Sequence, residues 1–325
     1  MGFVHAQAWQ AIPEAQLVGL VDTDPNLLKT LGESIGVSGF SNLDTALREV
    51  DVDIIDICLP THLHREAAEA ALAAGKHVIC EKPLALSLKD ARAIIDAAAA
   101  AKKQVLVGHV LRFFRVYQKA RQLVLDHTLG QIGTIKTFRG GSYPKGWHDW
   151  YGDPAKSGTL ATDLLIHDFD FLMWCFGPVE RVYAKSLAGH ITGAADHVLA
   201  SLRFKSGPIA HVEGTWAYPK GFSYAFEIAG ADGLIHFDSA DKGPIHTLLR
   251  SGSERNASVE VPESPVEISP YQAELAHFLE VITHDTLPVV TAEDGYNALA
   301  VSLAVRDSIQ SGEPVLLPGR TGGES

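Results

Sequence analysis

The chain has 325 residues, of which 46% are hydrophobic and 20% are charged, and its formal net charge is −12. This length indicates two domains, and the composition excludes a disordered chain, a coiled coil and a small disulfide-stapled protein. An acidic chain without a run of Lys or Arg repels phosphate backbones, so nucleic acid is not an expected partner. No apolar stretch reaches the roughly 20 residues that span a bilayer, so no membrane partner is expected either.

The three cysteines, Cys58, Cys80 and Cys175, lie far apart inside apolar runs and form no C-x-x-C pair. Their positions predict buried free thiols in a reducing compartment. The sequence also lacks a basic segment followed by an apolar leader. We therefore expect a cytoplasmic protein.

The first third of the chain alternates strand and helix patterns. Short apolar runs predict strands over 16–22, 52–59, 77–80 and 104–110. Helical patterns lie between them, over 25–35, 44–50, 62–74 and 87–102, and Ser87 is the expected cap of the last. Such alternation predicts βαβ units and a parallel sheet covered on both faces, which we assign to a first domain of residues 1–112.

Beyond residue 112 the pattern changes. Strands are predicted over 132–142, 179–188, 197–205, 209–218, 223–230 and 233–238, and helices over about 159–175, 270–283 and 292–311. Several strands alternate apolar and polar residues and are joined by short turns, as at Ser206-Gly207. We expect an antiparallel sheet with helices, forming a second domain of residues 113–325.

A strand that ends in Asp22 has the form of the second half of a dinucleotide-binding fingerprint. In that fingerprint the carboxylate accepts hydrogen bonds from the ribose hydroxyls and repels a 2′-phosphate, which favours NAD over NADP. The alternative is a solvated turn residue or a helix cap ahead of Pro25, and one strand-terminal Asp does not decide between them.

Glu81-Lys82-Pro83 follows the third apolar run directly. The carboxyl ends of parallel strands open onto the ligand crevice, so Glu81 and Lys82 are expected where a nicotinamide would lie. A cis Lys82–Pro83 bond, which X-Pro sequences permit, would turn the ammonium inward. The alternative is an exposed loop with an ordinary ion pair.

Asp163 and His167 are four residues apart in a segment with a helical pattern. On one helix they would lie on the same face, where the carboxylate stabilises a charged imidazole that acts as a general base toward an alcohol. A structural His–Asp pair is the alternative. A metal site with His148 and Asp149 as further ligands is a third option, but the spacing matches no known ligand frame, and we expect no metal.

Together with other segments in the same order, these motifs resemble the Gfo/Idh/MocA family of sugar and cyclitol dehydrogenases. The matching segments are Gly2-Phe3-Val4-His5-Ala6, Leu59-Pro60-Thr61-His62-Leu63-His64, Glu81-Lys82-Pro83, Val107-Gly108-His109-Val110-Leu111-Arg112-Phe113, the Asp163 and His167 pair, and Ser308 to Leu317. The resemblance covers nearly the whole chain. It implies a Rossmann domain followed by a domain with a large, mainly antiparallel sheet.

The resemblance also implies roles for individual residues. Lys82 and His167 would be catalytic, His167 as the acid/base, and Asp163 would orient His167 or the substrate. Contacts with NAD, or less favourably NADP, are implied for Gly2, Phe3, Val4, Asp22, Leu59, Pro60, Thr61, His64, Glu81, Lys82 and Arg112. Trp147, His148 and Trp150 are candidate sugar contacts, since aromatic rings pack on the C–H faces of sugars; packing between domains is the alternative for the tryptophans.

The chain departs from the family pattern at its start. Gly2 aligns with the third glycine of the fingerprint, so the first two glycines and the first strand, which is central in such a sheet, are missing. We expect a nucleotide sheet without its central strand, and a natural start about a dozen residues upstream. Translated upstream sequence without a strand followed by G-x-G would contradict this hypothesis.

The expected function is hydride transfer between a sugar, sugar-derivative or inositol-like alcohol and a nicotinamide cofactor, in a homodimer or homotetramer. One alternative is a non-catalytic relative that senses a nucleotide or sugar. Another is a metal-dependent enzyme of the second domain.

Overall fold

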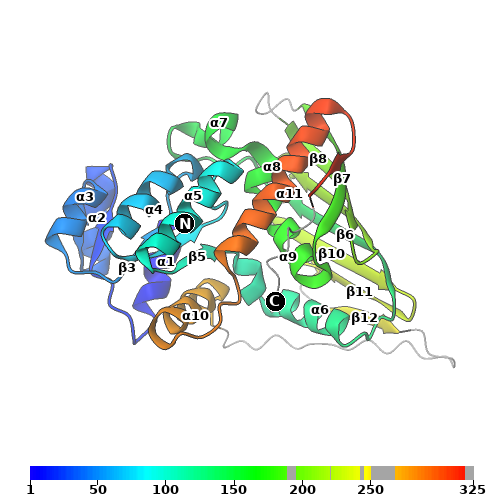
Figure 1. Ribbon diagram of the computed structural model, residues 1–325, viewed down its shortest axis with the longest axis horizontal. Coiled ribbons are helices and arrows are strands. Elements are labelled where there is room, and N and C mark those ends of the chain that lie inside the picture. The colour runs from blue at the N-terminus through cyan, green and yellow to red at the C-terminus, as the bar shows by residue number, and fades with distance from the viewer. Residues whose placement is uncertain (189–194, 220, 242–244, 250–267, 319–325) are drawn as a thin grey trace. The chain divides into compact units, whose positions relative to one another are not determined.

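The computed structural model describes residues 1–188, 195–219, 221–241, 245–249 and 268–318 (Figure 1). The chain divides into two compact units, Met1–Phe113 with Ile268–Tyr296, and Phe114–Glu267 with Asn297–Ser325. The sequence-based division instead kept everything after residue 112 in the second domain. Segment 268–296 groups with the first unit because its helix packs against the start of the chain and against residues 110–113.

The first unit contains the helices of a βαβ pattern. They are α1 (Gly2–Gln10), α2 (Pro25–Ile35), α3 (Leu43–Glu49), α4 (His64–Ala73), α5 (Leu88–Ala101) and the later α10 (Pro270–His284), with 3₁₀ turns η1 (Thr61–Leu63) and η2 (Val110–Phe113). Side-chain caps fix the start of two of these helices. The Asp24 carboxylate accepts the N–H groups of Asn26 and Leu27 at the start of α2, and the Ser87 hydroxyl accepts the N–H of Asp90 at the start of α5. The predicted bounds of α2 are confirmed, and Ser87 is the cap that the sequence predicted.

The parallel strands of the first unit form two separate sheets. They are β1 (Gly19–Val21), β2 (Ser38–Phe40), β3 (Ile54–Ile57), β4 (His77–Glu81) and β5 (Val105–Gly108). β1 pairs only with β2, while the other sheet has the order β3-β4-β5. Within the described ranges no strand joins β1 to β3, which confirms the expected sheet without a central strand. β2 was not predicted, because Ser38-Gly39-Phe40 does not lie in an apolar run as β1 does.

The second unit is built on one eight-stranded sheet. Its strands are β6 (Ile132–Gly140), β7 (Val179–Ala188), β8 (Ala195–Phe204), β9 (Ile209–Thr215), β10 (Ser223–Gly230), β11 (Gly233–Asp238), β12 (His246–Leu249) and β13 (Val315–Leu316). Their order is β12-β11-β10-β6-β9-β8-β7-β13, with β6 and β9 parallel and the other neighbours antiparallel. The predicted mainly antiparallel sheet is confirmed.

Helices cover one face of this sheet. The second unit contains α6 (Arg115–Leu125), the 3₁₀ segment η3 (Trp147–Gly152), α7 (Pro154–Ser157), α8 (Thr159–Asp163), α9 (Ile166–Phe176) and most of α11 (Ala292–Ser311). α6, α8 and α9 lie on the same side of the sheet (Figure 1). Val198, Ala200 and Leu202 of β8 are buried, whereas Leu199 between them is 54% exposed. The period-2 alternation read from the sequence therefore separates a covered face from an open one.

α6 is a helix that the sequence-based assignment did not contain. Tyr117 and Ala120, three residues apart on it, are its buried positions.

Among the described residues, no helix combines the length and the apolar character that crossing a membrane requires.

Candidate active site

The carboxyl end of β4 carries the Glu81-Lys82-Pro83 tripeptide. Glu81 is the last residue of the strand and is buried, and the Lys82–Pro83 peptide bond is cis. The Glu81 carboxylate accepts the backbone N–H of Lys82 at 3.0 Å through Oε2. The sequence permitted a cis bond at this position without requiring one, and the structure contains it.

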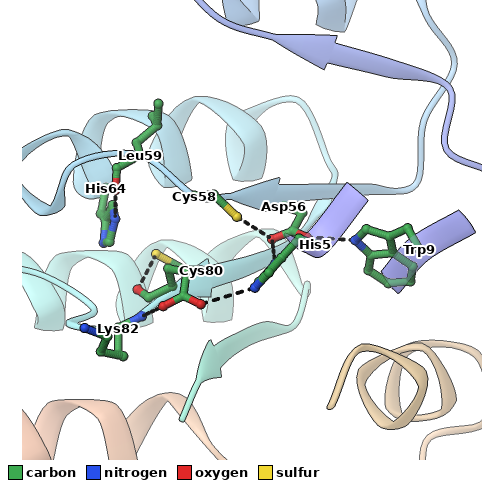
Figure 2. Close-up of polar contacts among 9 residues, drawn as sticks. His5, Trp9, Asp56, Cys58, Leu59, His64, Cys80 and Lys82 are labelled. Carbon is green, nitrogen blue, oxygen red and sulfur yellow. Dashed lines mark hydrogen bonds and ion pairs between the residues drawn. The ribbon is translucent and has the colours of Figure 1, made fainter. Parts of the chain in front are cut away.

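His5 of α1 lies beside the Glu81 carboxylate. Its Nε2 is 3.2 Å from Glu81 Oε1, and its Nδ1 is 2.9 Å from Oδ2 of Asp56 in β3 (Figure 2). Asp56 Oδ2 also accepts the indole N–H of Trp9 at 2.7 Å, and the Cys58 thiol lies 3.7 Å from Oδ1. His5 and Trp9 reach the same carboxylate because residues four apart share one face of a helix.

The charges in this cluster shift one another's protonation equilibria. Burial disfavours a charged His5, but the Asp56 carboxylate outweighs it and raises the pKa of the imidazole well above its usual value. Burial likewise opposes ionisation of Glu81, yet the hydrogen bond and charge of His5 leave its pKa below the ordinary one. Burial and the charge of Asp56 raise the pKa of the Cys58 thiol to about 12. The cluster thus favours an imidazolium between two carboxylates and a protonated thiol.

His64 holds the other side of the tripeptide. The first residue of α4, it is buried, and its Nδ1 and Nε2 each lie 2.8 Å from a carbonyl oxygen, those of Pro83 and Leu59 respectively. Burial lowers the pKa of His64. The loop after β3 and the loop after β4 therefore both contact one imidazole, and Figure 2 shows the contact with Leu59.

A metal ion would find three candidate ligands in the first unit. Ligand atoms of His5, Asp56 and Cys58 all lie within 4.8 Å of one another. Both His5 nitrogens and both Asp56 oxygens already have hydrogen-bond partners in the protein, and the thiol is not a thiolate. We therefore interpret the group as a hydrogen-bonded network.

The positions expected to touch a dinucleotide fit one. Asp22 follows β1 and is partly exposed, with its Oδ1 accepting the N–H of Asp24. Gly2, Phe3 and Val4 form the first turn of α1, which has no side-chain cap, and the Val4 N–H bonds to the Met1 carbonyl at 2.7 Å. A partly exposed carboxylate after β1 can accept hydrogen bonds from ribose hydroxyls, and an uncapped helix N-terminus can receive a phosphate, so both groups are compatible with a dinucleotide.

The remaining predicted cofactor positions differ in their surroundings. Leu59, directly after β3, is 41% exposed, and Pro60 is partly exposed, whereas Thr61 is buried in η1. Arg112 is buried as well, and its NH1 donates to the Val289 carbonyl at 2.7 Å and to Asp294 at 3.3 Å. These contacts join η2 to the start of α11 inside the first unit, a structural use that the sequence motif did not indicate.

Asp163 and His167 lie on two helices rather than one. α8 ends at Asp163, and α9 begins at Ile166. Between them the N–H groups of Leu164 and Leu165 both bond to the Leu160 carbonyl, which interrupts the regular ladder. The single helix predicted over 159–175 is therefore wrong.

The aromatic segment before these helices is exposed. Trp147, His148 and Trp150 belong to η3, where Trp147 is 57% exposed, and both His148 and Asp149 have left-handed backbone conformations with φ of 49° and 50°. The Trp147 ring stands edge-on to His148, while Trp150 stacks on Tyr151 with ring centroids 4.0 Å apart. Trp147 therefore leaves more than half of its surface exposed, whereas Trp150 is stacked on its neighbour.

A buried ion pair next to His167 was missed by sequence reasoning. Arg139 of β6 donates through Nε to Asp168 at 2.6 Å, and its NH2 donates to the Tyr117 hydroxyl at 3.1 Å. All three side chains are buried, so the pair fastens α9 to the sheet one residue beyond His167. Arginine within an alternating strand and a second Asp after His167 were visible signals, but their pairing depends on the tertiary fold.

Comparison with known proteins accounts for both units. Residues 1–109 match the oxidoreductase family, NAD-binding Rossmann fold, and residues 121–317 match the C-terminal alpha/beta domain of the same family. The chain is 30% identical to 1,5-anhydro-D-fructose reductase of Ensifer adhaerens over 84% of this chain and 82% of that protein. It is 28% identical to myo-inositol 2-dehydrogenase of Thermotoga maritima, covering 98% of this chain and 96% of that one.

Solved structures give the same result. A probable dehydrogenase from Thermotoga maritima superposes with a TM-score of 0.83 at 27% identity, over 97% of this chain and 95% of the other. Levoglucosan dehydrogenase in complex with NADH has a TM-score of 0.89 at 23% identity, over 98% and 96%, which supports the fold. Both halves of the chain match one family in its domain order, so this protein belongs to the Gfo/Idh/MocA family of NAD-binding oxidoreductases.

Proposed function

We propose that the protein is an NAD-dependent dehydrogenase that oxidises a secondary alcohol of a sugar, a sugar derivative or a cyclitol. The observation that carries this proposal is the position of the Lys82 backbone at the carboxyl end of β4, where its N–H bonds to a histidine-bound Glu81 and the next residue, Pro83, is bound by a second histidine. The relatives named above act on substrates of these classes.

Lys82, Asp163 and His167 are the proposed groups at the reacting carbon. Bound nicotinamide would accept the hydride of the carbinol carbon at its C4. The Lys82 ammonium donates a hydrogen bond to the reacting hydroxyl, and His167 takes the hydroxyl proton as the carbonyl forms. Asp163 orients the imidazole or the substrate. Trp147, His148 and Trp150 are proposed sugar contacts.

Turnover measurements with a panel of polyols and sugars test this proposal. Lys82→Ala and His167→Ala should each lower kcat by about a hundredfold or more, since positioned proton transfer contributes on that order. Lys89→Ala, on the exposed side of α5, is the matched control and should leave the rate unchanged. Rates within a few-fold of the parent for both site variants would contradict the mechanism, and NADH binding without turnover on any polyol would point to the sensor alternative.

Asp22 is the proposed determinant of cofactor choice. Its carboxylate repels a 2′-phosphate, so Asp22→Ser should raise kcat/KM for NADP relative to NAD by about tenfold or more. An unchanged ratio would remove Asp22 from the cofactor site.

The open face of the eight-stranded sheet is the proposed subunit contact of a homodimer or homotetramer. It carries exposed apolar side chains that a second copy would cover, namely Tyr183, Leu187, Leu199 and Ile209. Light scattering should find a dimer or tetramer that Leu199→Asp dissociates; a parent monomer at micromolar concentration would contradict this.

The free cysteines support a cytoplasmic location, which we also propose.

A further inference from the structure

Two carboxylates with little exposure lie on the same face of the β3-β4-β5 sheet, Asp56 with 16% and Glu81 with 7% of the side chain exposed. Asp56 pairs with Ile79 in register, and Glu81 follows Ile79 by two residues, so Asp56 and Glu81 point to the same side. Glu81 pairs in turn with Gly108 of β5. The Glu81 carboxyl group fills the space beside this glycine, since a Cβ added there would lie 3.3 Å from it. The strands therefore confine both carboxylates beneath α1, where their charges repel each other.

His5 is the side chain that α1 places between them. It is 2% exposed and meets one carboxylate with each ring nitrogen. An ionised carboxylate only accepts hydrogen bonds, and a neutral imidazole has one N–H, so satisfying both contacts requires both ring nitrogens to be protonated. Cys58 and the ring of Tyr271, 6.2 Å away, complete the surroundings of His5.

We propose that His5 is a positioning residue for the reaction: as an imidazolium between Asp56 and Glu81, it holds the Glu81 carboxylate against the Lys82 backbone and so fixes the starting point of the Lys82 side chain. This inference rests on the proposed role of Lys82. The chain of contacts runs from Trp9 through Asp56, His5 and Glu81 to the Lys82 amide (Figure 2).

Loss of the imidazolium should disturb Lys82 through charge rather than through packing. His5→Gln keeps a polar side chain but leaves two carboxylates facing each other, so Glu81 moves away and Lys82 loses its alignment. We expect kcat to fall by about ten- to a hundredfold, the order that a small misplacement of a reacting group costs, with a much smaller change in NADH affinity.

A double-mutant cycle separates this role from simple packing. In the Glu81→Gln background one of the two charges is gone, so adding His5→Gln should cost less than about threefold. Equal losses in both backgrounds would overturn the proposal, since they are what a packing role predicts. His77→Gln is the matched control: His77 begins the strand that Glu81 ends, and its replacement should leave kcat unchanged.

A measurement without substrate tests the bridge itself. In the full chain labelled with ¹⁵N-histidine, the His5 signal is the one of 15 that His5→Gln removes. It should show two protonated nitrogens at about pH 8.5, where ordinary histidines, with a pKa of about 6.5, are neutral. A neutral His5 at that pH would overturn the proposal even if the enzyme turns over. An intact imidazolium without turnover on any polyol would count against the proposed function alone.

Discussion

His64 uses its two ring nitrogens for two loops of the first unit. Both partners are backbone carbonyls, of Leu59 and Pro83, and both contacts are 2.8 Å long. Because its lowered pKa favours a neutral imidazole with one N–H, the ring donates to one of the two carbonyls and packs against the other.

Replacing His64 should therefore be costly. We expect His64→Ala to lower the free energy of unfolding by about 1–3 kcal/mol, the cost of leaving buried polar groups unsatisfied. Urea denaturation measures this difference. Arg65→Ala, the next residue on α4 and 41% exposed, is the control and should change stability much less. A His64→Ala protein as stable as this control would mean that water replaces the imidazole without loss.

At the scale of residues, the sequence predicted positions better than partnerships. The motif placed Lys82 directly after a strand, which is confirmed because the end of a strand depends on neighbours in the chain. The X-Pro sequence only permitted the cis bond that the structure contains. The contact between His5 and Asp56 could not be predicted from neighbouring residues, because the two are 51 residues apart in the chain. Asp56 was visible as a polar residue within an apolar run, but only the fold identifies its partner.

Among the elements, α9 is fastened to β6 by the buried Arg139–Asp168 pair. Removing one member leaves the other charge buried, which costs about 3–5 kcal/mol. We expect a loss of that order in Arg139→Met by denaturant unfolding. In the double variant Arg139→Met with Asp168→Leu much of the loss should return, because an apolar pair replaces the ion pair. A double variant no more stable than the single one would indicate that Tyr117 or packing, not charge, carries the effect.

The start of α11 is held by Asp294. Its Oδ2 accepts the backbone N–H and the hydroxyl of Thr291 and lies 3.3 Å from Arg112. Burial opposes ionisation, but Arg112 and Thr291 lower the pKa of Asp294 below its usual value.

This shift predicts a pH-dependent contribution to stability. A carboxylate with a depressed pKa stabilises the fold above its unfolded pKa of about 3.9, and the contribution disappears as the pH falls through the folded value. Asp294→Asn should therefore be less stable than the parent at pH 7, and the difference should shrink below about pH 4. Urea unfolding between pH 7 and pH 3 measures it; a constant difference would exclude the charge as its cause.

The sequence predicted elements well where a pattern ran for several residues. The bounds of α2, β10 and β11 are the ranges predicted from the sequence, and the alternation in β8 separates its buried residues from its exposed ones. The prediction of elements failed where the backbone changes its conformation although the residue types continue the same pattern. The break at Leu164 and Leu165 lies in a continuous helical sequence, and β12 and β13 are too short to stand out.

In the whole molecule, the first unit depends on residues from late in the chain. Phe278 of α10 is fully buried, and its ring meets Phe113 edge-on at 5.9 Å. The Gln272 side chain donates to the Ala11 carbonyl, and Tyr271 lies beside His5. α10 thus covers elements whose residues precede it by about half of the sequence or more.

Phe278→Ala should expose that dependence. Truncating a buried Phe costs about 3–5 kcal/mol, and we expect the loss in the first unit. Hydrogen exchange followed by mass spectrometry should become faster in β4 and β5, while β8 and β9 keep their protection. Faster exchange confined to the eight-stranded sheet would show that α10 supports the second unit instead.

The return of α10 to the first unit also orders the events of protein synthesis. Residues 1–113 leave the ribosome before the strands β6 to β12, yet the helix that covers Phe113 and packs on α1 is made only after those strands. The first unit is therefore completed only after most of the second unit has been made. Until then its apolar surface at Phe113 stays open, and the growing chain must keep that surface from other partners while the second unit is already being assembled.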